Sequence, residues 1–213
     1  MFCPNYCVYF GQITSKNKMK SAEDKIEARI RKRGGGRVVF AGDFTDIATQ
    51  DTVNKSLFRL AKEGVLIRCA SGIYFFPKKD KLPPDIDSIA KAIAKRDKAR
   101  IVPTGAYALN ALGLSTQVPM NVVYLTDGAA RKISVGDGRG ITLKHTAPKN
   151  LAYTSDLMML VVSAMKEIGE GQLTEIESGK IASLLKQYEV KENILRDIRL
   201  APAWIREIIL KMI

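Results

Sequence analysis

The sequence predicts an α+β fold in two parts, and two observations support this. Apolar residues at helical spacing alternate with short β-rich runs that end at glycine turns. A polar segment ending in proline, KKDKLPP at residues 78–84, interrupts this pattern, so we place a domain boundary there. We therefore expect an extension at 1–18, disordered or from an upstream start codon, followed by domains at 19–82 and 83–213.

The charge is unevenly distributed. The net charge is +12, yet residues 151–213 hold eight Lys and Arg against nine Asp and Glu, so the excess lies in the first 150 residues. A basic part beside a neutral part favours a polyanion partner for the first. The alternative is a generally basic protein that its charge keeps in solution.

Cysteine and histidine content argues against disulfides and metals. The three cysteines, Cys3, Cys7 and Cys69, show no repeated spacing, and His145 is the only histidine. No apolar run is long enough to span a bilayer. We expect a reducing cytoplasm and neither a metal nor a cofactor.

The first domain begins with a predicted helix over 21–33, in which Ser21 and Asp24 form a capping-box pattern. An extended piece over 37–40, a short helix over 41–47 and a turn over 48–50 follow. A second helix is predicted over 51–63, with Thr49 or Asp51 as its N-cap and Gly64 past its end.

This second helix has two different faces. Val53, Leu57 and Leu60 fall on one side, whereas polar and basic residues fall on the other. Next, VLIRCASGIYFFP predicts a hairpin around the Ser71-Gly72 turn, with Arg68 near its tip. Helix, turn, helix and hairpin together outline a winged helix-turn-helix.

That outline predicts a DNA-contacting surface. Asn and Gln pair with adenine edges, and Arg and Lys bind guanine or phosphate. The alternative is an ordinary solvated helix face. The predicted DNA-binding residues are Gln50, Thr52, Asn54, Lys55, Arg59, Lys62, Arg68 and Ser71.

The second domain is predicted to hold a small antiparallel sheet and several helices. A helix over 85–96 and an extended piece over 99–102 precede a small-residue helix capped by Thr104. Short turns join predicted strands at 121–126, 132–135 and 141–146, which favours antiparallel pairing. Further helices follow, capped by Thr154 or Ser155, by Thr174 with Glu177, and by Pro202 in a first turn.

Nothing in the sequence favours catalysis. The GDGRG loop at 136–140 lies between predicted strands, so a hairpin turn explains it better than a phosphate-binding loop. His145 fits a structural role, and Asp127, Asp137 and Lys144 only loosely match the spacing of metal-dependent nucleases. We expect no catalytic residues and no enzyme.

Several segments carry a family resemblance. The segment LFRLAKEGVLIRCASGIYFFP resembles the N-terminal domain of the AbiEi-type antitoxins of the abortive-infection AbiE systems. The segments IVPTGAYALNALGLSTQVPMNVVYLTDG and RKISVGDGRGITLKHTAPKNL resemble that family's second domain, and LAPAWIREII resembles the ending of one branch. The resemblance covers about residues 20–213 and leaves out the 1–18 extension.

The resemblance implies a type IV toxin–antitoxin component acting in phage defence. The N-terminal domain would bind inverted repeats in double-stranded promoter DNA and repress its own operon. The C-terminal domain would counteract a nucleotidyltransferase-like toxin, with or without direct contact. The main alternative is a winged-helix transcriptional regulator whose second domain senses a ligand or oligomerises, with no toxin partner.

Overall fold

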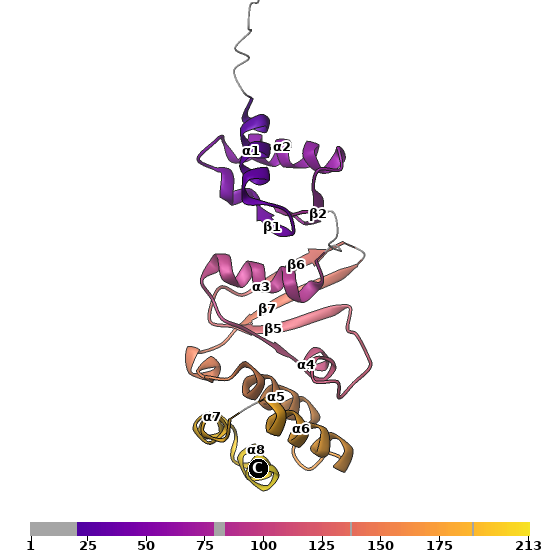
Figure 1. Cartoon of the computed structure of the whole chain (residues 1–213), viewed down its shortest axis with the longest axis vertical. Helices are drawn as coiled ribbons and strands as arrows, with labels where there is room; N and C mark the ends of the chain where they lie inside the picture. Colours follow the sequence, from indigo (N-terminus) through magenta and orange to yellow (C-terminus); the bar gives the residue numbers. More distant parts are fainter. Residues whose placement is uncertain (1–20, 79–83, 137, 189) are drawn as a thin grey trace, which may run out of the picture.

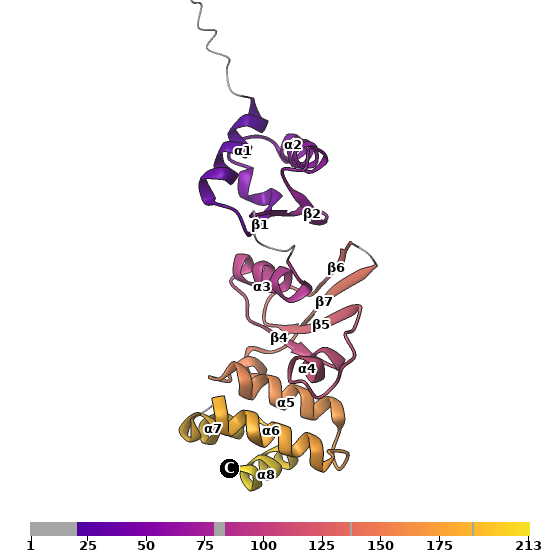
Figure 2. The ribbon, with the colours of Figure 1, turned by 45° about the vertical axis from the view of Figure 1, so that its right-hand side comes forward.

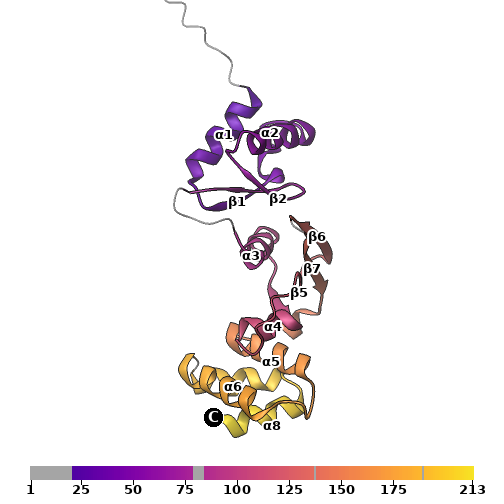
Figure 3. The same cartoon turned by 90° about the vertical axis from the view of Figure 1, so that its right-hand side faces the viewer.

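Eight α-helices and two small sheets make up the described part of the chain. The computed structural model describes residues 21–78, 84–136, 138–188 and 190–213. The α+β class is therefore confirmed. The elements follow one another along the long axis of the molecule, from the N-terminal unit through the central sheet to the C-terminal helices (Figure 1, Figure 2 and Figure 3). The predicted extension 1–18 and the predicted boundary between 82 and 83 lie outside the described residues.

The N-terminal unit packs two helices on a three-stranded antiparallel sheet with strand order β1-β3-β2. Its elements are α1 (Ala22–Arg33), β1 (Arg37–Phe40), a 3-10 turn (Ala41–Phe44), α2 (Gln50–Lys62), β2 (Ile67–Ala70) and β3 (Ile73–Phe76). The predicted helix over 41–47 is thus shorter and of the tighter 3-10 type.

Local capping sets where α1 begins. The Ser21 hydroxyl accepts from the backbone N–H of Asp24, and the Asp24 carboxylate accepts from the backbone N–H of Ser21. This reciprocal pair satisfies two N–H groups that the first helical turn leaves free. The predicted capping box is therefore confirmed. Ile26 and Ile30 then pack against the buried side of α2.

The central unit contains two helices and a four-stranded sheet. Its elements are α3 (Ile86–Asp97), β4 (Ile101–Thr104), α4 (Ala106–Ala111), β5 (Asn121–Thr126), β6 (Arg131–Val135) and β7 (Arg139–His145). In Figures 1 and 2, α3 lies beside β6 and β7 and α4 lies near β5. Asp87 of α3 and Tyr107 of α4 both contact the buried Tyr124 of β5.

The predicted antiparallel sheet is wrong, because the sheet is mixed. Its strand order is β4-β5-β7-β6, and β7 lies between β5 and β6, running parallel to β5. The short turn over 127–130 does reverse the chain between β5 and β6. The two strands do not pair with each other, however, because β7 lies between them and pairs with both. Short connections therefore predicted the chain reversal correctly and the neighbour incorrectly.

The predicted Thr104 cap of α4 is also wrong. Thr104 is the last residue of β4, and Gly105 occupies the N-cap position with φ +64° and no side-chain cap bond. A positive φ at this position favours glycine over threonine, because a Cβ atom would strain the backbone. The predicted extended piece at 99–102 accordingly shifts to 101–104.

The C-terminal unit is helical. It comprises a 3-10 turn (Pro148–Leu151), α5 (Asp156–Ile168), α6 (Glu175–Tyr188), α7 (Lys191–Asp197), a 3-10 turn (Ile198–Leu200) and α8 (Ala203–Met212). Ser155 caps α5, and Pro202 occupies the N-cap of α8. The seven-residue helix α7 was not predicted. Its buried Asp197 accepts hydrogen bonds from the backbone N–H groups of Thr154 and Ser155, at 2.8 and 2.7 Å.

Three apolar clusters form the core, and one of them joins the first two units. This bridging cluster combines Phe40, Ile73 and Phe75 of the N-terminal sheet with residues of α3 and the central sheet, among them Ile93 and Tyr124. A backbone bond from Gly136 N–H to the Cys69 carbonyl, at 3.2 Å, links the same two sheets. In the described residues, no helix is long and apolar enough to cross a membrane.

Candidate nucleic-acid interface

Helix α2 has one buried side and one polar side. Val53, Leu57 and Leu60 are at most 1% exposed and pack on α1. Thr49 precedes the helix as its N-cap, without a side-chain cap bond. All eight residues that the sequence predicts for DNA contact are exposed, six of them on α2, Arg68 on β2 and Ser71 at the hairpin turn.

A groove of about 500 Å³ runs between α2 and the β2–β3 hairpin. We call it the α2 groove. It brings together five of the eight predicted residues, which are Gln50, Asn54, Lys55, Arg68 and Ser71. These offer two amides, a hydroxyl and two cations. Such a set can hydrogen-bond to base edges and neutralise phosphates.

The other three predicted residues do not line the α2 groove. Arg59 lies toward α1, where its Nη1 is 3.4 Å from Oε2 of Glu23, although its side chain is 66% exposed. Thr52 lies 3.0 Å, hydroxyl to hydroxyl, from the N-cap residue Thr49. Of these residues, Arg59 therefore lies on the part of α2 that faces α1.

The two amides of the groove are already ordered. Gln50 Nε2 donates to Asn54 Oδ1 at 3.1 Å, one helical turn away. Each amide keeps further donor and acceptor capacity, because a Gln or Asn side chain can form several hydrogen bonds. A ligand would therefore meet two amides that already hydrogen-bond to each other.

Phe58 is a residue of this surface that the sequence analysis missed. It lines the groove and is 42% exposed. Lys62 Nζ lies 5.1 Å and the Arg68 guanidinium carbon 6.0 Å from its ring centroid. The ring thus holds one cation from α2 and one from the hairpin by cation–π attraction. Its spacing of four residues from Asn54 was the signal that could have revealed it.

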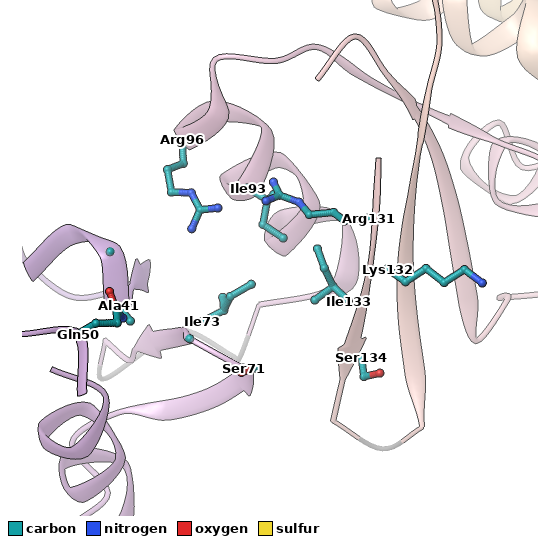
Figure 4. Close-up of a pocket in the computed structure, with 12 residues that line it drawn as sticks. Ala41, Gln50, Ser71, Ile73, Ile93, Arg96, Arg131, Lys132, Ile133 and Ser134 are labelled. Carbon is teal, nitrogen blue, oxygen red and sulfur yellow. The ribbon is translucent and has the colours of Figure 1, made fainter. Parts of the chain in front are cut away.

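The hairpin turn needs glycine. Gly72 has φ +68°, and a Cβ atom there would meet nothing closer than the Ala41 side chain, at 3.8 Å. The requirement is therefore conformational and not steric. The turn presents the exposed Ser71 beside Gln50, and Figure 4 shows both at the rim of a second cavity.

Other chemistry-bearing residues are occupied or lie elsewhere. His145 Nδ1 is 2.9 Å from the Gly128 carbonyl, and Asp127 accepts from the backbone N–H of Arg100. Cys69 is buried, and this burial raises the pKa of its thiol. Within the described ranges, no group of three His, Cys, Asp or Glu residues could hold a metal ion. The predicted features at Cys3, Cys7 and Asp137 lie outside those ranges.

Comparison with known proteins returns a family without an assigned activity. The model of a family of unknown function (DUF6088) matches residues 25–194. The matched range runs from α1 into α7, so it contains the α2 groove, the hairpin and the central sheet. No curated protein matches the chain.

Proposed function

The chain belongs to this family of unknown function, and we propose that it is a double-stranded DNA-binding protein whose N-terminal unit is a winged helix-turn-helix. In this proposal α2 is the recognition helix and the β2–β3 hairpin is the wing. The observation that carries the proposal is the α2 groove, where Gln50 and Asn54 meet Lys55 and Arg68. The net charge of +12 supports an anionic partner.

Each groove residue has a role in this proposal. Gln50 and Asn54 lie in the first turns of α2, where a recognition helix contacts base edges. Lys55 and Arg68 bind phosphates on the two sides of the groove, and Phe58 holds Arg68 in place. Arg59 and Lys62 extend the phosphate contacts along α2, and Ser71 contacts the backbone from the wing.

The salt dependence of DNA binding tests the phosphate contacts. We expect Lys55→Ala and Arg68→Ala each to reduce the slope of log affinity against log salt by about 1, because each phosphate contact releases condensed counterions. Fluorescence anisotropy with a duplex from the protein's own promoter measures this slope. Lys186→Ala is the matched control, since Lys186 is an exposed lysine on α6. Slopes equal to that of wild type in both groove variants would exclude the α2 groove as the site of phosphate contacts.

Base reading requires a separate test. Asn54→Ala should weaken binding to the promoter duplex by about 1–3 kcal/mol and leave binding to a random duplex nearly unchanged. An equal loss on both duplexes would assign Asn54 to the DNA backbone instead.

We further propose that the protein is the antitoxin of a type IV toxin–antitoxin system and represses its own operon. The support is the resemblance of the 101–128, 131–151 and 200–209 segments to AbiEi-type antitoxins. Its partner would be a nucleotidyltransferase-like toxin encoded next to it. The alternative is a transcriptional regulator whose second domain senses a ligand or oligomerises.

Co-expression with the adjacent gene separates these two roles. The full-length Lys55→Ala/Arg68→Ala double variant should lose promoter binding and still rescue growth, because antitoxicity is assigned to residues C-terminal to the wing. The full chain is the right reagent, since the bridging cluster shares its core between the first two units. Absence of toxicity, or absence of rescue by wild type, would favour the regulator.

A further inference from the structure

A second cavity lies where the hairpin of the N-terminal unit meets strand β6 of the central sheet. Its volume is about 490 Å³, within the roughly 300–1,000 Å³ of small-molecule sites. We call it the inter-unit pocket. The N-terminal unit contributes Ala41, Gln50, Ser71 and Ile73, whereas α3 and β6 contribute Ile93, Arg96, Arg131 and Ile133 (Figure 4).

The pocket carries an excess of positive charge on one wall. Arg96 Nε donates to Asp97 Oδ1 at 3.0 Å, and Arg131 Nη2 contacts the other oxygen of the same carboxylate. Two guanidinium groups thus share one carboxylate, and one positive charge stays uncompensated. No carboxylate is among the residues that line the cavity.

Arg131 also has an unused donor. Its Nε is buried and has no hydrogen-bond partner in the described structure. A buried donor without an acceptor is costly, because it has lost its water and gained nothing in exchange. Burial, followed by the charge of Arg96, lowers the pKa of Arg131, which indicates that the surroundings disfavour its charge as they stand. An anion in the pocket would supply both the acceptor and the missing negative charge.

The rest of the lining is mostly apolar, with polar groups from serines, Gln50 and Lys132. Ile73, Ile93 and Ile133 come from three different elements, and Ser71 and Gln50 add polar groups at the rim (Figure 4). Such a cavity suits a molecule with an anionic end and an apolar body. Lys132, the neighbour of Arg131 on β6, also lines the cavity, and Figure 4 shows its side chain directed away from the arginines.

We propose that the inter-unit pocket binds a small amphipathic oxyanion, a phosphate or carboxylate attached to an apolar group. Arg131 and Arg96 hold the oxyanion, and the three isoleucines contact the apolar body. The pocket shares Ala41, Gln50, Ser71 and Gly72 with the α2 groove. Bound ligand therefore competes with DNA for the wing and the start of α2, a consequence that rests on the proposed function.

Calorimetric titration of the full chain tests the site without DNA. Phenyl phosphate and benzoate are the probes with an anionic end and an apolar ring, and whichever binds more tightly identifies the oxyanion. Inorganic phosphate lacks the ring, and benzyl alcohol lacks the charge. We expect at least one of the two probes to bind saturably at one site. Inorganic phosphate and benzyl alcohol should bind at least about tenfold more weakly than that probe.

Variants assign the binding to the pocket. Arg131→Ala should weaken the binding of the favoured probe about tenfold or more, and Lys186→Ala, an exposed lysine on α6 that does not line the pocket, should leave it unchanged. Arg131→Lys keeps the charge but loses the planar fork of the guanidinium group. Its affinity for the probe should therefore lie between those of wild type and Arg131→Ala. If Arg131→Ala does not fold, as judged by circular dichroism, Arg131→Lys and Arg96→Ala provide the comparison. Saturable binding by none of the probes, equal binding of benzyl alcohol, or wild-type affinity in the arginine variants would overturn the proposal.

The link to DNA has its own readout. At constant ionic strength, the favoured probe should lower promoter affinity in wild type and have no effect in Arg131→Ala or, if that variant does not fold, a reduced effect in Arg131→Lys. By linkage, DNA must weaken probe binding by the same factor. Probe binding in a protein that does not bind DNA would overturn the competition and the proposed function while retaining the anion site. DNA binding in a protein that does not bind the probes would overturn the site alone.

Discussion

Tyr153 shows how burial at a single residue makes stability depend on pH. It is 4% exposed within the C-terminal core, and burial, followed by the charge of Asp197, raises its pKa to about 12. The unfolded chain has the ordinary tyrosine pKa of about 10. Because the raised pKa belongs to the folded state, burial of the neutral Tyr153 side chain contributes its full stabilisation below about pH 10. This stabilisation is lost as pH rises toward 12.

Tyr153→Phe should remove this part of the pH dependence. Between about pH 9 and about pH 11.5, we expect the variant to lose roughly 1–2 kcal/mol less stability than wild type, after allowing for solvent screening. Urea unfolding at the two pH values measures it. Tyr124, whose pKa is also raised by burial and the charge of Asp87, remains in both proteins, so the difference isolates Tyr153. An identical loss in both proteins would contradict the assignment.

At the scale of one element, α6 begins with a reciprocal cap. The Thr174 hydroxyl accepts from the Glu177 backbone N–H, while the Glu177 carboxylate accepts from the N–H and hydroxyl of Thr174. The backbone hydrogen bond, followed by the hydroxyl bond, lowers the pKa of Glu177. This stabilisation is present at neutral pH and is lost as pH falls through the lowered pKa.

Thr174→Ala should cost about 1 kcal/mol of unfolding free energy, because the first turn of α6 loses its cap. The pKa of Glu177 should rise but stay below its ordinary value, since the backbone N–H of residue 174 still donates. Nuclear magnetic resonance titration of Glu177 follows this. Thr174→Ser keeps the hydroxyl and is the control. A Glu177 pKa unchanged in the alanine variant would show that the hydroxyl contributes nothing.

At the scale of the whole molecule, the bridging cluster couples the N-terminal unit to the central sheet. Ile93 is 1% exposed in this cluster, whereas Ile209 is fully buried in the C-terminal cluster. Ile93→Ala leaves a cavity and should cost about 3 kcal/mol. Because the cluster draws on both sheets, hydrogen-exchange protection should fall together in α2 and β5.

Ile209→Ala is the matched control for this coupling. It should reduce amide protection mainly in α5, α6 and α8, whose residues share its cluster. If Ile93→Ala reduced protection in β5 and left α2 unchanged, the two units would unfold independently. That result would also justify experiments on the N-terminal unit and the rest of the chain as separate proteins.

Local patterns were enough for much of the fold. The Ser21–Asp24 and Thr174–Glu177 caps, the Ser71-Gly72 turn and the helical spacing of α2 involve residues at most four apart, so their physics is contained in short segments. The same spacing correctly placed the predicted contact residues of α2 on its exposed side. Helix α7 was missed because its Asp197 is satisfied by backbone groups more than 40 positions earlier.

The sequence by itself therefore determined most of the segments that become helices, turns and strands, and which side chains α2 exposes. Only the tertiary structure decided that β7 lies between β5 and β6, that Arg68 and Phe58 meet across the α2 groove, and that Arg131 of β6 lies beside Arg96. The physical reason is range. Capping and periodicity act within a turn or two, whereas strand order and cavities depend on which buried surfaces of distant segments pack together.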